Sequence, residues 1–158
     1  MQLEDYGRRL VLDLPFHRGV ALTADALDRG GFQIVARVNV RDELKRTLDH
    51  DFRHYVLFVA CSPQTTLDVL MEDLGAGTAL PITIAVYELA DGETVVVAAE
   101  PFEALVNDAG WCRAHPGLAA LAAAETERLA RALDDLYRRG SAQREVNSLD
   151  GSAVKVPC

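Results

Sequence analysis

The spacing of apolar residues predicts alternating strands and helices in the first half of the chain. A loosely alternating run ends at Pro15. Apolar residues then recur at helical spacing from Phe16 until Gly30 and Gly31, a pair typical of a helix C-terminus. The predicted elements are a strand over 8–14, a helix over 16–30, a half-buried strand over 32–40, a short helix over 42–48, and a strand over 54–60 that is apolar enough to be buried on both faces.

The second half begins with a helix whose start is well marked. Ser62 is a suitable N-cap and Pro63 a suitable first helical residue, and the glycines that follow at 75 and 77 end this helix. Strands over 80–89 and 94–99 form a hairpin through the turn Asp91-Gly92. A loop over 110–116 leads to a long helix over 118–137.

This order predicts an α+β fold of one domain. The terminal hairpin excludes a purely parallel sheet, so we expect a two-layer sandwich in which helices pack on one face of a mixed or mostly antiparallel sheet of about five strands. The domain spans residues 1–139, and the polar segment 140–158 is expected to be a tail. The other sheet face needs cover, which a second copy in a homodimer would provide.

Charge and composition exclude several classes of function. The 158 residues carry a formal net charge of -8, and no Lys or Arg occurs between His54 and Cys112. Such a surface repels phosphate backbones, so nucleic-acid binding is not expected; it aids solubility, or it docks a basic protein partner. The chain has no apolar run long enough to cross a membrane and no apolar signal segment, so we expect a cytoplasmic protein without a membrane partner.

The motifs in the sequence predict neither a cofactor nor a metal site. Phosphate-binding glycine loops, nucleophile elbows and zinc-protease motifs are absent from the sequence. His50 and His54 are four residues apart, but His54 begins a strand. Cys112 and His115 form a CxxH without a second pair, so an ordinary loop is the simpler interpretation.

Two residues are left as candidates for chemistry. Cys61 lies just before a helix N-terminus, where the helix dipole favours a thiolate, but free cysteines are also often buried in cores. Glu125 falls on the apolar stripe of the last helix, where it would lie at a margin, be paired, or line a cavity. Rotating that helix by one residue moves Glu125 into solvent, and we favour this orientation.

The segment DFRHYVLFVACSPQTTLDVLMEDLGAGTALPITIAVYE, together with the preceding Gly31-Phe32 and the Asp91-Gly92 hairpin, resembles the bacterial and archaeal family called domain of unknown function 302. The resemblance runs from about Leu14 to Leu136 and implies a small, often dimeric α+β fold with no established activity. Relatives commonly have Cys-Asn-Pro and Leu-Pro-Cys-Asn where this chain has Cys61-Ser62-Pro63 and Leu80-Pro81-Ile82-Thr83. The resemblance therefore implies that a second thiol is missing here.

Three functions are consistent with these observations. The first is a cytoplasmic, homodimeric and non-enzymatic module that binds a small ligand or a protein partner in a pocket lined by Cys61, Ser62, Pro81 and Thr83. The second is a thiol enzyme or sulfur carrier with Cys61 as nucleophile. The third is a structural or regulatory dimer that acts through its acidic face.

Overall fold

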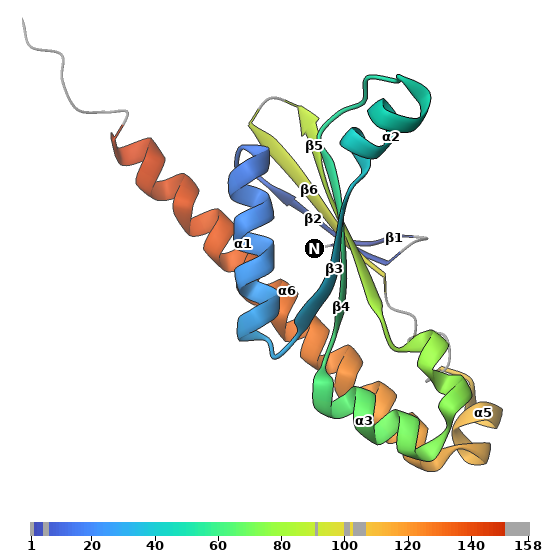
Figure 1. The fold of residues 1–158 in the computed structure, drawn as a ribbon. Helices are drawn as coiled ribbons and strands as arrows, with labels where there is room; N and C mark the ends of the chain where they lie inside the picture. Colours follow the sequence, from blue (N-terminus) through green and yellow to red (C-terminus); the bar gives the residue numbers. More distant parts are fainter. Residues whose placement is uncertain (1, 5–6, 91, 100–101, 103–106, 151–158) are drawn as a thin grey trace, which may run out of the picture.

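An antiparallel sheet of six strands forms the centre of the protein, in the order β1-β2-β6-β5-β4-β3 (Figure 1). The structure is a computed structural model that describes residues 2–4, 7–90, 92–99, 102 and 107–150. The strands are β1 (Gln2–Glu4), β2 (Gly7–Leu12), β3 (Gln33–Asn39), β4 (Tyr55–Cys61), β5 (Ile82–Ala90) and β6 (Glu93–Ala98). The α+β class and the antiparallel sheet are confirmed, and β1 is an additional strand that the sequence pattern did not predict.

Helices α1 and α6 pack on one face of this sheet (Figure 1). The helices are α1 (Phe16–Arg29), α2 (Val40–Leu48), α3 (Pro63–Glu72), the 3-10 helix η1 (Leu74–Ala79), α5 (Ala109–Ala114) and α6 (Pro116–Asp150). The start of α3 is confirmed, with Ser62 as N-cap and Pro63 as its first residue. β5 and β6 pair antiparallel as predicted, while the turn residue Asp91 lies outside the described residues.

Two boundaries near the C-terminus differ from the prediction. The expected loop over 110–116 contains α5 instead, because the Asp108 side chain caps that helix by accepting a hydrogen bond from the Trp111 amide at 2.7 Å. Helix α6 continues to Asp150, so the expected end of this helix at Tyr137 is wrong, while the polar tail over 140–158 stays a prediction. A Cβ at Gly140 would lie 2.8 Å from Leu12 Cδ2, so this glycine allows α6 to pass closely over β2 and does not end the helix.

The main core lies between the sheet and the crossing helices α1 and α6. Phe58 on β4 and Ile84 on β5 are fully buried, as are Leu27 on α1 and Leu133 on α6. The end of α1 lies close to α6 at Gly30, the residue after α1, where a Cβ would lie 2.7 Å from the Cβ of Ala132. A smaller apolar cluster fixes α3 and η1 against the first turns of α6; its buried members are Val69, Leu80, Phe102, Leu118 and Ala122.

The sheet face opposite α1 and α6, called the open face below, carries apolar side chains in three cross-strand rows. These side chains alternate with core residues along each strand. Strand pairing aligns the rows Ala36–Val59–Thr83, Val38–Leu57–Ala85–Val97 and Tyr55–Tyr87–Val95–Val11.

Burial on the open face is incomplete, which corrects the prediction that β4 is buried on both faces. Tyr55, Leu57 and Val59 are only half-buried, and Val38 is 42% exposed. The half-buried strand predicted over 32–40 would have had Ile34 and Ala36 on the same face of the sheet. In β3 a bulge between these two residues places them on opposite faces. The open face is therefore largely apolar and partly exposed, although Thr83 in its first row is polar and Val95 in its third row is fully buried.

Candidate functional site

The four residues predicted to line a pocket lie near one another, but on different sides of the sheet. β4 and β5 are neighbours, and Val59 pairs with Thr83, so the two proline-containing segments do end close together. Cys61 is half-buried and belongs to the open face, while Pro81 and Thr83 are exposed. Ser62 turns the other way and is buried beneath α3. Cavities described below have other linings, so a pocket formed by these four residues remains a proposal.

Ser62 takes part in a buried polar cluster that joins α3 to α6. Its side chain makes no capping hydrogen bond. The Thr65 hydroxyl lies 3.2 Å from Ser62 Oγ and 2.9 Å from Glu125 Oε2. Because an ionised carboxylate can only accept, Thr65 donates to Glu125 and accepts from Ser62. The three side chains thus form a chain of hydrogen bonds between two helices.

Glu125 faces the interior, which corrects the expectation that it points into solvent. Its residue is 3% exposed, and its Oε2 lies 3.4 Å from Arg128 Nε in addition to the bond from Thr65. The carboxylate is tolerated inside because a hydroxyl and a guanidinium replace part of its hydration. Thr65, its hydrogen-bond donor, is 60 positions away in the sequence, so no local sequence pattern indicates this hydrogen bond.

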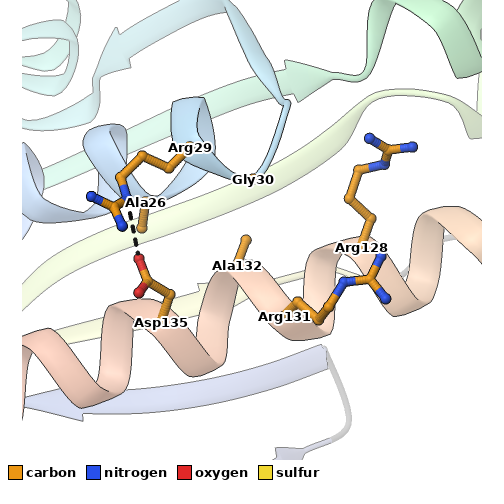
Figure 2. A pocket seen from close by; sticks show the side chains of 7 residues that line it. All are labelled: Ala26, Arg29, Gly30, Arg128, Arg131, Ala132 and Asp135. Atoms are coloured by element: carbon orange, nitrogen blue, oxygen red, sulfur yellow. Dashed lines mark ion pairs between the residues drawn. The ribbon is translucent and has the colours of Figure 1, made fainter.

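A second group of charged residues surrounds a cavity of about 260 Å³ where the end of α1 crosses α6 (Figure 2). This arginine cavity is lined by Ala26, Arg29, Gly30, Arg128, Arg131, Ala132 and Asp135. Figure 2 shows Ala132 between the helices at the middle, with Arg29 and Asp135 on one side and Arg128 and Arg131 on the other. Its floor is therefore small and apolar, and its two ends are charged.

Each arginine that lines the cavity has one carboxylate nearby, which for Arg128 is Glu125 at 3.4 Å. Arg29 Nε lies 3.6 Å from Asp135 Oδ2, and Arg131 pairs with the exposed Glu127 at 2.6 Å. Sequence reasoning missed this cavity because Arg29 is about 100 residues from the others. One signal was present: 128, 131 and 135 fall at spacings of three and four on the predicted last helix, and therefore on one face.

Two further cavities lie elsewhere in the protein. One of about 240 Å³ is enclosed by η1, α5 and the start of α6, with Phe102, Trp111 and Leu118 among its lining residues. The other, of about 460 Å³, lies beside the end of β5 against Arg53 and Glu88.

The histidine and cysteine pairs weighed as metal ligands have other contacts. His54 stacks on Phe16 at 5.0 Å between ring centroids and lies 2.9 Å from an Arg41 nitrogen. His115 stacks on Trp111 at 5.3 Å. Within the described ranges, no three His, Cys, Asp or Glu side chains gather as a metal site would need. In the same ranges, no helix is long and apolar enough to cross a membrane.

The arrangement defines an α+β protein built on an antiparallel sheet with one uncovered apolar face. The family described as "Domain of unknown function DUF302" matches residues 9–136, and the chain belongs to that family. It is similar to the crystal structure of an uncharacterised conserved DUF302 protein from Bacillus stearothermophilus, with a TM-score of 0.67 and 25% identity over 83% of this chain and 98% of the other. No curated protein matches the chain significantly.

Proposed function

We propose that this protein is a non-enzymatic homodimeric module in which a second copy covers the open face. The observation that carries the proposal is the set of three apolar rows that the described helices leave uncovered. Water-exposed apolar area of this kind is typical of an interface. In such a dimer the half-buried residues of β4 become core residues, as their sequence pattern predicts.

The chemistry of the open face favours a second copy over a charged partner. The chain has a formal net charge of -8, yet no acidic residue belongs to the three rows. Arg9, paired with Val97, continues one row at its edge. A basic partner would find no carboxylate in these rows, whereas two uncharged apolar faces related by a two-fold axis complement each other.

The area of the open face can be compared with the area that a specific dimer interface buries. Five strands spaced about 4.8 Å apart, each contributing about 17 Å of length, give a footprint of about 400 Å² per subunit. Specific interfaces bury at least about 1,000 Å² in total, so the sheet alone falls slightly short. Phe52 is 39% exposed and its ring lies 6.4 Å from that of Tyr55 on the open face, so this side chain extends the apolar surface beyond the sheet.

A ligand or protein partner would bind at the rim of this interface, beside Cys61. There the thiol and the exposed Pro81 and Thr83 lie at adjacent strand ends, and Ser62 lies directly behind them in the polar cluster. In a dimer, a rim of this kind is completed by the partner subunit, which makes a shallow site deeper. This site would bind and would not catalyse, because among the described residues no basic side chain bonds to Cys61 to activate the thiol.

Sedimentation equilibrium at micromolar concentration tests the dimer. We expect twice the mass of one chain for the wild type. Ala85→Glu places a carboxylate in the middle row of the open face and is expected to give monomers. Leu67→Glu, which makes the same addition of charge at an exposed apolar position on α3, should remain dimeric. A monomeric wild type, or a dimeric Ala85→Glu variant, would contradict the proposal.

A further inference from the structure

We propose that the arginine cavity between α1 and α6 binds a small organic oxyanion that also carries a hydroxyl or amino donor. This site is on the helical side of the sheet. It is therefore separate from the open face, and its test does not depend on whether the protein is a dimer.

Two unsatisfied atoms identify the cavity as a binding site. Among the described residues, the buried side-chain nitrogen and oxygen atoms without a hydrogen bond are Arg128 Nε and Asp135 Oδ2, and both residues line this cavity. Arg128 Nε lies 3.4 Å from Glu125, and Asp135 Oδ2 lies 3.6 Å from both Arg29 and Arg139, but none of these contacts is a hydrogen bond. Buried polar atoms are nearly always hydrogen-bonded, so a donor and an acceptor are left here for a ligand.

The charged side chains at the two ends of the arginine cavity determine which groups the ligand must carry. Three guanidinium groups and one carboxylate line the cavity, in a protein whose overall charge is negative. At one end Arg128 and Arg131 can bind an oxyanion through paired N–H groups, a geometry that suits carboxylate and phosphate. At the other end the Asp135 carboxylate favours a hydrogen-bond donor.

The spacing of the two ends limits the size of the ligand. Residues 128 and 135 are two helical turns apart on α6, which corresponds to about 10 Å along the axis. The side chains reach into the space between, so a molecule of three or four carbons spans it. The volume of about 260 Å³ lies just below the usual range for ligand pockets, which also indicates a small metabolite.

Isothermal titration calorimetry with two matched probes tests the site. Glycerol 3-phosphate and glycerate both carry hydroxyl donors and differ in the oxyanion, so the tighter binder shows whether phosphate or carboxylate is preferred. Sulfate, an oxyanion without a hydroxyl or amino donor at neutral pH, should bind more weakly than the preferred probe. Asp135→Asn should reduce this difference in affinity between the probes with and without a donor, because it removes the charged acceptor.

Matched variants separate this site from non-specific binding. Arg131→Gln should weaken binding about tenfold or more, since it removes one charged hydrogen-bonding partner. Arg131 is 64% exposed and pairs only with exposed Glu127, so its loss should not unfold the protein. Arg46→Gln on α2 is the control, because Arg46 is 71% exposed and pairs with Glu43 on its own helix. The proposal is overturned if neither organic probe binds at millimolar concentration, or if Arg46→Gln weakens binding as much as Arg131→Gln.

Discussion

The hydrogen bond from Thr65 to Glu125 should make a large contribution to stability, because it is buried and charged. Thr65→Val keeps the size and branching of the side chain but removes the donor, leaving a carboxylate that is 3% exposed with one fewer partner. Hydrogen bonds to charged groups contribute about 1.5–3 kcal/mol. For a protein of this length, that loss lowers the melting temperature by about 3 to 12 °C.

Thr66→Val provides a matched control on the same helix. The Thr66 hydroxyl donates to the Ser62 carbonyl at 2.9 Å, a neutral bond within the first turn of α3, so its loss should cost less than about 1 kcal/mol. Urea denaturation followed by circular dichroism measures both variants. If Thr65→Val loses no more stability than Thr66→Val, the argument that Glu125 fastens α6 to α3 is refuted.

A double-mutant cycle isolates the interaction from other effects of the substitution. In a Glu125→Gln background the acceptor is neutral, so Thr65→Val should then cost less than in the wild type. The difference should be about 0.5–3 kcal/mol, the usual range for residues in contact. A cost that is the same in both backgrounds would show that Thr65 does not depend on the charge of Glu125.

Two further predictions concern the open face. Cys61 lies on this face, so if the proposed dimer forms, its alkylation should be slow in the wild type and faster in Ala85→Glu; equal rates measured by mass spectrometry would place Cys61 outside the interface. Burial, and secondly the charge of the stacked Tyr87, raises the pKa of Tyr55 above its usual value of 10.0. Because the folded pKa is the higher one, the stability from neutral Tyr55 is complete below about pH 10 and is lost as pH rises through the folded pKa. Denaturation midpoints between neutral and strongly alkaline pH should therefore fall less in Tyr55→Phe, and an identical fall would contradict this assignment.

Local signals in the sequence were sufficient for most of the fold. Ser62 and Pro63 mark the start of α3 by chemistry that acts within one turn, and the apolar run of β4 identified a strand with neighbours on both sides. The last helix was expected to end at Tyr137 because the segment that follows lacks sustained apolar periodicity and is rich in small and polar residues. Gly140 belongs to this segment, and only its close approach to Leu12 shows why α6 has a glycine there.

The candidate sites were harder to predict because their residues are distant in sequence. Glu125 was expected in solvent, because an inward carboxylate is rarely free and a rotation of the last helix by one residue would expose it. Thr65 reaches it only once α3 and α6 are packed together. The arginine cavity likewise depends on the crossing of α1 and α6, which brings Arg29 to residues that follow it by about 100 positions.

Intermolecular contacts at the open face test the central claim most directly. In a sample that mixes isotope-labelled and unlabelled chains, filtered nuclear Overhauser spectra report only contacts between copies. We predict such contacts for the methyl groups of Leu57, Val59 and Val97, which lie in the rows of the open face. No contacts there, or contacts confined to exposed methyls of α3 such as Leu67 and Met71, would contradict the claim that a second copy covers this face.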